Sequence, residues 1–267
     1  MDLKKYELLA KEYEEYKEKG KIWGLVRQER ISQIKFPRIS KEIIDQYMAL
    51  DDVTSTVSDI MDTMGIAGAV SASHIKPVFP NRKIVGTAVT LRNIPERMTV
   101  TQGYVAKRYD DIRMATKDMY YLSEPGDILV VDGGGSPDIS HIGGQSCTVA
   151  KACKMGGTVV DGSIRDIDTI RKLDYPIWSK GITPITGKFR IEAIEVNGPV
   201  RIHNIQVIPG DLVIADETGV CFIPADKVDV ILAELKRIIN LETDLTVLVD
   251  KDASLEEIRN VYKKRYS

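Results

Sequence analysis

The sequence predicts an α/β fold in which part of the central sheet is parallel. Three observations lead to this prediction: short runs rich in Val and Ile that are bounded by Gly, Pro and Asp, helical periodicities between some of these runs, and the alternation of the two along the middle of the chain. Strands that alternate with helices form parallel strand–helix–strand units. The expected strands are 84–91, 128–131, 158–160, 205–208, 212–215 and 220–223.

Three helices are expected before the first of these strands. The first one ends at Gly20, and its apolar side chains recur at spacings of three and four: Tyr6, Leu9, Tyr13 and Tyr16. Because this apolar stripe is narrow, the helix needs a surface to pack on, which is either its own domain or a neighbouring subunit. A second helix is expected from Ser40, and a third over 54–64, ended by Gly65.

Two helices are expected between the strands, over 145–155 and over 166–173. From 199 to 224 strands follow one another without a helix, which predicts an antiparallel portion. Ser254 and Glu257 form a capping box for a last helix. A long helix is expected before it, with a repeating apolar face: Val228, Ile231, Leu235 and Ile238.

The charge balance limits the kind of partner. The chain has 267 residues, 37 Lys and Arg against 39 Asp and Glu, and a formal net charge of -2. A protein dedicated to nucleic acid usually carries a basic excess, so no nucleic-acid partner is expected. No apolar stretch approaches the roughly 20 residues of a membrane span, and the N-terminus lacks the apolar run of a signal peptide. We therefore expect a cytoplasmic protein with no membrane partner.

Several common functional motifs are absent or incomplete. The glycines at 133–135 follow a strand, but a dinucleotide fingerprint needs a third Gly where Asp138 stands. Gly187-Lys188 is followed by Phe189 and lacks the rest of a P-loop. Neither a Gly-x-Ser-x-Gly elbow nor a His-Glu-x-x-His zinc motif occurs. The sequence therefore does not indicate the familiar hydrolases and nucleotide-binding enzymes.

The cysteines do not indicate a metal or redox centre either. Cys147, Cys153 and Cys221 form no Cys-x-x-Cys pair, and the chain has only three histidines, so a zinc site is not expected. Free cysteines are among the most buried residues in proteins, and we expect these three to be small core residues.

The segment 160–166 is the strongest functional candidate. Gly162 lets the chain turn away from a buried strand, Arg165 projects from the turn, and Asp166 begins a helix. This Asp and Arg could simply cap the helix and pair locally. Alternatively, Arg165 binds a substrate carboxylate through two hydrogen bonds and Asp166 holds a hard divalent cation at the carboxyl edge of the sheet. The start of the Gln145 helix would then offer backbone N–H groups to the same anion.

At this point the sequence resembles the RraA-like family, which includes the class II 4-hydroxy-4-methyl-2-oxoglutarate and 4-carboxy-4-hydroxy-2-oxoadipate aldolases and the regulators of ribonuclease activity A. The similarity runs from about residue 50 to about residue 225 in the order and spacing of its motifs. These are Ser58-Asp59, Gly86-Thr-Ala-Val-Thr90, Val-Val-Asp132-Gly-Gly-Gly, Gly143-Gly144, Val-Val-Asp161-Gly-Ser-Ile-Arg165-Asp166, Tyr175-Pro176-Ile-Trp and Pro209-Gly210-Asp211-Leu-Val-Ile-Ala-Asp216-Glu-Thr-Gly-Val.

The resemblance implies a three-layer β/β/α sandwich of the swivelling type, here with added N- and C-terminal helices. The corresponding division is a helical extension over 1–48, a core domain over 49–226 and C-terminal helices over 227–267. It further implies a homotrimer or homohexamer with active sites at subunit interfaces. Its activity would be that of a lyase that depends on Mg²⁺ or Mn²⁺ and cleaves a small 2-oxo acid to release pyruvate, with oxaloacetate decarboxylation as a side reaction.

Carried over by position, the resemblance also assigns residues. Arg165 and Asp166 would be the catalytic residues, with Arg165 on the pyruvyl carboxylate and Asp166 on the metal. The substrate would also contact the loop before the second helix of the core, through the backbone amides of Gly143, Gly144, Gln145 and Ser146. Since the motif contains no obvious Schiff-base lysine, a Lewis acid must take the charge released by C–C cleavage.

One departure from the family pattern leaves the substrate open. The aldolases generally have Asp where this chain has Gly144, and that Asp helps to organise the water around the metal. The regulators, on the other hand, lack an Asp after the Arg, whereas Asp166 is present here. Two alternatives to the lyase therefore remain: a metal-dependent enzyme acting on a sugar acid or other hydroxy acid, and a non-catalytic regulatory binding protein.

Overall fold

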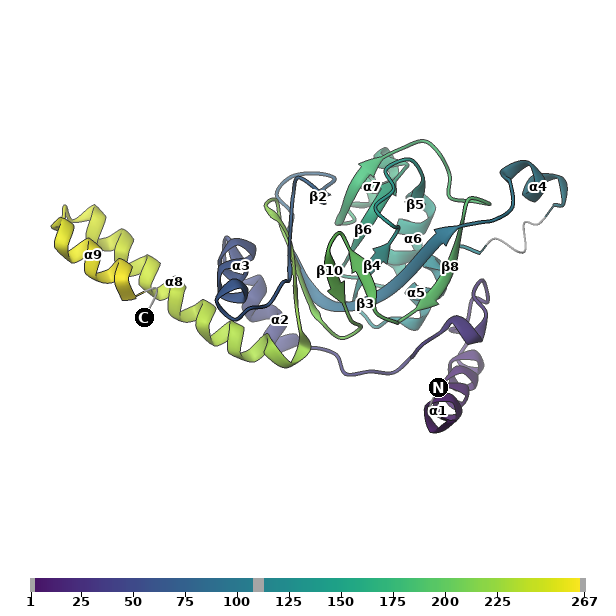
Figure 1. Ribbon diagram of the computed structural model, residues 1–267, viewed down its shortest axis with the longest axis horizontal. Coiled ribbons are helices and arrows are strands. Elements are labelled where there is room, and N and C mark those ends of the chain that lie inside the picture. The colour runs from purple at the N-terminus through teal and green to yellow at the C-terminus, as the bar shows by residue number, and fades with distance from the viewer. Residues whose placement is uncertain (1–2, 108–112, 265–267) are drawn as a thin grey trace.

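The predicted α/β class is confirmed by the computed structural model, which describes residues 3–107 and 113–264 and has one large mixed sheet with helices around it (Figure 1). In the 10-stranded sheet the order is β1-β12-β11-β3-β4-β6-β7-β2, with β5 beside β6 and β8 beside β3. The strands are β1 (Ala69–Ser71), β2 (Lys76–Pro77), β3 (Ile84–Pro95), β4 (Ile128–Asp132), β5 (Ser140–Ile142), β6 (Gly157–Ile164), β7 (Ile177–Ile182), β8 (Ile191–Val196), β9 (Val200–Ile202), β10 (Ile205–Val207), β11 (Leu212–Ala215) and β12 (Gly219–Ile223).

The helices lie at both ends of the chain and between the parallel strands. They are α1 (Leu3–Glu18), α2 (Lys41–Met48), α3 (Val53–Thr63), α4 (Val100–Val105), α5 (Thr116–Leu122), α6 (Gly144–Ala152), α7 (Ile167–Leu173), α8 (Val228–Asp250) and α9 (Leu255–Lys264). The capping box predicted for the last helix is present, since Ser254 and Glu257 exchange hydrogen bonds. None of the described helices is long and apolar enough to cross a membrane.

The parallel part of the sheet consists of β3, β4, β6 and β7, as the alternation of strands and helices predicts. One of its faces is covered by α5, α6 and α7, whose side chains Tyr120, Cys147 and Ile170 are buried against Val131 and Val160 of the strands. These strands are buried on both faces, which explains their continuous apolar runs.

The other face of these strands meets a second β layer. Side chains of β9 and β10, which form a two-stranded antiparallel sheet, are buried against β4 and β6 together with side chains of β11 and β12. The outer side of β11 and β12 is covered by α2, α3 and α8. The antiparallel portion predicted over 199–224 is therefore confirmed. The two β layers with the helical layer of α5, α6 and α7 match the predicted sandwich, to which α2, α3 and α8 add a cover on the opposite side.

Several predicted boundaries differ from the structure; the strand predicted over 84–91, for example, extends to Pro95, and two further differences have local reasons. The helix predicted over 145–155 ends at Ala152, because Lys154 adopts a left-handed conformation with φ of 58° that a helix cannot contain. The strand predicted over 158–160 extends to Ile164, because Ser163 and Ile164 continue the ladder with β7. The predicted core cysteines are partly confirmed: Cys147 and Cys221 are buried, Cys153 is half-buried, and all three are free.

The N-terminal helix packs on its own chain. Leu9 and Tyr16 of α1 are buried in the same cluster as Val26 and Ile34, which belong to residues 21–39, a mostly extended segment that we call the N-terminal arm. Figure 1 shows the arm running from α1 to α2 along one side of the sheet. The division at residues 48 and 226 stays a prediction.

Candidate functional site

The fold brings the two glycine-rich segments and the Arg-Asp pair to one edge of the sheet. Strands β5 and β6 are parallel neighbours, so the residues that follow them emerge side by side. Arg165, directly after β6, donates its backbone N–H to the carbonyl of Ile142 at the end of β5, with an N–O distance of 3.0 Å. Gly143 then starts α6 next to this turn. The carboxyl ends of parallel strands are where open α/β sheets place their ligands.

Asp166 does not serve as a helix cap, although it occupies the cap position of α7. Its side chain makes no capping hydrogen bond and its backbone is left-handed, with φ of 61° and ψ of 43°. Its Oδ2 instead accepts the Gly144 N–H at 3.0 Å and lies 3.6 Å from Nε of Arg165. Asp adopts left-handed backbone more readily than most residues, because its short polar side chain can hydrogen-bond locally.

The pair faces a small open cavity of about 160 Å³. This volume is below the roughly 300 Å³ of pockets for drug-sized ligands, so it suits a small metabolite. Five of the six residues predicted for the site line the cavity, whereas Gly144 does not and instead binds Asp166. The lining residues are Leu25, Met114, Thr116, Lys117, Ser140, His141, Ile142, Gly143, Gln145, Ser146, Arg165, Asp166, Thr186, Gly187 and Lys188.

Two cations of the cavity were missed by the sequence analysis. Lys117 comes from α5 and Lys188 from the loop after β7. Gly187-Lys188 lacks the rest of a P-loop, but its glycine has a structural reason. A Cβ added at Gly187 would lie 2.5 Å from the carbonyl oxygen of Ser140, so no side chain fits there. That close approach brings the Gly187 backbone against β5, beside the cavity. Lys117 carries no local sequence signal.

The cavity is electrically positive. Arg165, Lys117 and Lys188 stand against one carboxylate, that of Asp166. In the part of the chain that the structure describes, neither lysine makes an ion pair, and the only ion pair of Arg165 is the one with Asp166. A cavity with this charge attracts small anions.

Two titratable side chains near the cavity are unsuited to acid–base chemistry. Burial and, to a lesser extent, the charge of Asp166 together raise the pKa of the Cys147 thiol to about 12. Burial lowers the pKa of His141 to about 4, and its Nε2 is enclosed, because a Cβ on Gly133 would lie only 2.5 Å from it. His141 is therefore a neutral core residue that donates or accepts one hydrogen bond with Asn93.

The acids at the ends of the neighbouring strands have structural roles. Asp132 at the end of β4 accepts N–H groups from Gly134 and Arg201, and Asp161 in β6 accepts the N–H of His203 at 2.8 Å. Both carboxylates thus hold the β9–β10 hairpin against the sheet. Of the strand-end acids on β4 and β6, Asp166 is the one that faces the cavity.

Among the described residues, Asp166 is the one carboxylate that lines the cavity and could hold a divalent ion. Residues 3–107 and 113–264 contain no group of three or more His, Cys, Asp or Glu side chains arranged to hold a metal. Mg²⁺ usually keeps several waters and takes one or two carboxylates. Asp166 supplies one, and its Oδ1 accepts no hydrogen bond from the described residues.

The departure at Gly144 is tied to the packing of α7. A Cβ at this position would lie 2.7 Å from Cβ of Thr169 and 3.1 Å from Cβ of Asp166. An Asp, as in the aldolases, therefore does not fit here without movement of α7. Whatever organises water around a metal in this chain is not a side chain at position 144.

Comparison with known proteins agrees with this geometry. The family model "RraA-like: Aldolase/RraA" matches residues 54–222. Protein DlpA of Legionella pneumophila is 28% identical over 209 residues, which are 78% of this chain but only 32% of DlpA. A protein of Halalkalibacterium halodurans named "Putative 4-hydroxy-4-methyl-2-oxoglutarate aldolase" is 32% identical over 69% of this chain and 78% of its own.

A solved structure shows the same fold. Streptomyces coelicolor RraAS2, described as an unusual member of the RNase ES inhibitor RraA protein family, superposes with a TM-score of 0.64 and 25% identity, over 78% of this chain and 98% of that one. The family match over residues 54–222 includes the Arg165-Asp166 turn and the start of α6. The chain therefore belongs to the RraA-like family.

Proposed function

We propose that the protein is a divalent-metal-dependent lyase that cleaves a small 2-oxo acid by a retro-aldol reaction, releases pyruvate and also decarboxylates oxaloacetate. The position of Asp166 is the observation that supports this most strongly. Its carboxylate is turned away from its own helix and into a cavity that otherwise presents cations. The aldolase named among the relatives supports the reaction class.

Arg165 and α6 bind and orient the substrate in this proposal. The guanidinium takes the carboxylate next to the 2-oxo group through two hydrogen bonds. The N–H groups of Gln145 and Ser146, in the first turn of α6, point toward the same anion. If Arg165 acts as a donor to charge that develops during the reaction, it contributes about 2.7–4 kcal/mol of transition-state stabilisation.

Asp166 is the metal ligand in this proposal. Asp166 would hold a divalent ion there, and the chemistry that such an ion would supply is Lewis-acid stabilisation of negative charge on the 2-oxo oxygen. Gly144 holds the carboxylate in place through its N–H, and Arg165 holds the same oxygen from the other side. The orientation of Asp166 is thus set before any ligand arrives.

Pyruvate release tests the proposal. Oxaloacetate and 4-hydroxy-4-methyl-2-oxoglutarate are each supplied with Mg²⁺ or with chelator, and pyruvate is measured through a coupled dehydrogenase. We expect turnover that the chelator abolishes and that Asp166→Ala removes, while Asp168→Ala, an exposed acid two residues along α7, keeps it. Unchanged turnover in Asp166→Ala would contradict the proposal.

A Schiff-base lyase is the chemical alternative that the same assay excludes or identifies. Lys117 and Lys188 both line the cavity, and an amine can form a covalent intermediate with a carbonyl substrate. Such an enzyme would keep its turnover in chelator and lose it on treatment with borohydride and substrate. We expect the opposite pattern.

A regulatory binding protein is the second candidate. It is favoured by the description of the S. coelicolor relative as a member of an RNase inhibitor family and by Gly144 in place of the aldolase Asp. A protein that binds a ribonuclease but releases no pyruvate from either substrate would support this candidate. For both candidates we propose a homotrimer or homohexamer without a bound nucleic acid, which light scattering and absorbance ratios of the purified protein check.

A further inference from the structure

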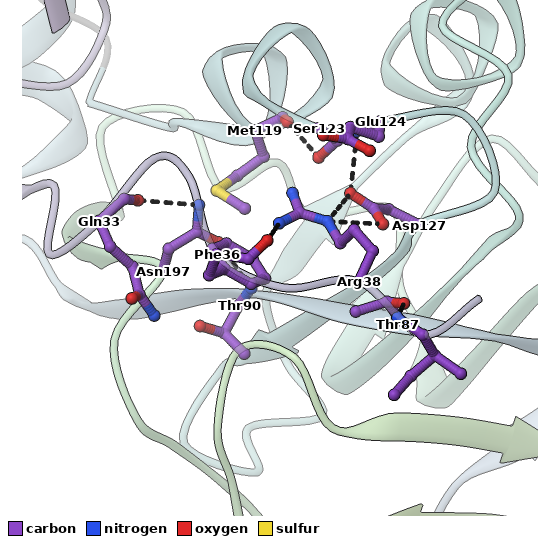
Figure 2. A network of polar contacts seen from close by, with 11 residues as sticks. Gln33, Phe36, Arg38, Thr87, Thr90, Met119, Ser123, Glu124, Asp127 and Asn197 are labelled. Atoms are coloured by element: carbon purple, nitrogen blue, oxygen red, sulfur yellow. Dashed lines mark hydrogen bonds and ion pairs between the residues drawn. The ribbon is translucent and has the colours of Figure 1, made fainter. Parts of the chain in front are cut away.

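The N-terminal arm lies outside the family match, which begins at residue 54, yet it is fixed to the core along its length. Ser32 donates its N–H to Val196, and Asn197 donates its side-chain amide to the carbonyl of Gln33. Figure 2 shows this hydrogen bond between Asn197 and Gln33 and, further along the arm, the side chain of Arg38 directed at Asp127. The arm is therefore held against the core by hydrogen bonds and by the Arg38–Asp127 ion pair.

The beginning of the arm forms one wall of the candidate cavity. Leu25 lines the cavity beside Thr116 and Lys117 of α5. The neighbouring Gly24 donates its N–H to Oδ1 of Asp118 at 2.8 Å, and that carboxylate is 2% exposed. Gly24 has φ of 90°, in the region that favours glycine, so the sharp turn that directs Leu25 to the cavity depends on this residue.

Trp23 holds the lysine that faces the cavity. Its ring stacks on Tyr121 of α5, with the centroids 5.7 Å apart and the planes at 26°. The ammonium of Lys117 lies 4.6 Å from the centroid of the Trp23 ring, which is cation–π distance. Because Lys117 has no carboxylate partner among the described residues, the indole is the group that restricts its position.

The cavity presents more cationic side chains than one substrate carboxylate can pair with. A monoanionic 2-oxo acid engages Arg165 and leaves Lys117 and Lys188 without an anionic partner. On the basis of the proposed function, we propose that the N-terminal arm completes the active site: Trp23 positions Lys117 so that its ammonium binds a second anionic group of the substrate. Lys117 is then a specificity-determining residue, and Trp23 is a positioning residue that acts through it.

Binding of two simple acids tests this inference without requiring turnover. Pyruvate carries one carboxylate and 2-oxoglutarate carries two, and the affinity of each is measured calorimetrically with Mg²⁺ present. We expect the wild type to prefer 2-oxoglutarate and Lys117→Met to lose about tenfold in affinity for it, since a hydrogen bond between charged groups has about this strength. The affinity for pyruvate should stay within about twofold of wild type.

Variants of the arm separate positioning from structure. Trp23→Leu should lose part of the 2-oxoglutarate preference, about threefold, and Trp23→Phe, which keeps an aromatic face, should restore it. Trp23 is 46% exposed, so neither change is expected to unfold the protein. Lys21→Met is the matched control. Lys21 belongs to the same arm and its ammonium also lies over an aromatic ring, that of Tyr16 in α1, but Lys21 does not line the cavity. This variant should bind both acids as the wild type does.

The outcomes distinguish this inference from the proposed function. An unchanged 2-oxoglutarate preference in Lys117→Met, or an equal loss of both acids, would overturn the role of Lys117. An equal effect of Trp23→Leu and Trp23→Phe would overturn the positioning role of the indole. If the preference behaves as expected but the wild type releases no pyruvate, the second anion site stands and the lyase reaction does not. If the wild type binds neither acid, both proposals fail.

Discussion

Two Arg–Asp pairs in this molecule have the same residue types but differ in burial and in their other partners. Arg38 and Asp127 are 14% and 4% exposed, and Nε of Arg38 lies 3.1 and 3.0 Å from the two carboxylate oxygens (Figure 2). Arg165 and Asp166 are 39% and 43% exposed and meet through a single contact of 3.6 Å. The first pair is closed, and the second is open to the cavity.

The difference lies in the remaining partners of each group. Arg38 also donates to the carbonyl of Phe36 and covers its ring, and Asp127 accepts the N–H of Glu124. Burial raises the pKa of Asp127 even beside Arg38, so the pair has a desolvation cost that its hydrogen bonds must offset. A pair with every partner in place stabilises the fold, whereas a loosely held pair can exchange its partner for a ligand.

Arg38→Ala should have the largest effect on stability. It leaves the buried carboxylate of Asp127 without its cation, which costs about 3–5 kcal/mol for a buried pair. Urea unfolding at pH 7 measures this loss. Lys41→Ala is the control, because Lys41 and Asp45 form an exposed pair worth less than about 1 kcal/mol. Turnover per folded molecule should not change in either variant. A loss of turnover in Arg38→Ala would contradict a purely structural role of the Arg38–Asp127 pair.

Asp118 differs from both pairs because it is a buried acid that has no cationic partner among the described residues. Burial raises its pKa to about 6, against the lowering effect of the N–H groups of Gly24 and Leu25. The folded state therefore holds a proton that the unfolded state releases near pH 4, and stability falls as pH rises from about 4 to about 6. A shift of two units corresponds to about 3 kcal/mol.

Asp118→Asn should remove this dependence. The free energy of unfolding of wild type minus that of the variant is expected to fall by about 3 kcal/mol between pH 4 and pH 7 and to stay level above pH 7. Taking the difference cancels His141, whose lowered pKa makes stability rise with pH over part of the same range in both proteins. A difference that does not vary with pH would show that Asp118 is not desolvated.

Gly144→Ala should weaken the open pair. The added Cβ meets Thr169 at 2.7 Å, and over-packing of this kind costs about 1–3 kcal/mol. Because the Gly144 N–H holds Asp166, the shift should also lower turnover. Thermal unfolding and pyruvate release measure the two effects.

Arg165→Lys should have the smallest effect on stability and a selective effect on binding. Lysine keeps the charge but loses the two-pronged donor that matches a carboxylate. We expect the KM for oxaloacetate to rise about tenfold, corresponding to about 1.4 kcal/mol, with the free energy of unfolding within about 0.5 kcal/mol of wild type. A stability loss as large as that of Arg38→Ala would mean that both pairs are structural.

The sequence predicted the parts of this site that are local. Arg165 and Asp166 are adjacent in the chain, and the strand before them is a continuous apolar run because it is buried on both faces. The resemblance to the family pointed to the same residues. Lys117, Lys188 and Leu25 were missed because they come from three distant segments that only the fold brings together.

The fold was predicted to a similar extent. The buried strands β4, β11 and β12 were located within a residue or two. The strand β8 was missed because two charged residues, Glu192 and Glu195, interrupt its apolar run; both are half-buried and pair with arginines. The short β5 has no such pattern, since Ser140 and His141 are buried polar residues; Ser140 donates to the carbonyl of Ile142, and His141 pairs with the distant Asn93.

Calorimetric titration of oxalate tests whether Asp166 holds a divalent metal beside Arg165. Oxalate resembles the 2-oxo acid end of the substrate, and we expect its carboxylates to bind Arg165 and a metal held by Asp166. Wild type and Arg38→Ala should bind it with Mg²⁺ and lose it in chelator, whereas Asp166→Asn should bind it weakly and equally in both conditions. Binding by Asp166→Asn that still depends on Mg²⁺ as strongly as in wild type would contradict the account.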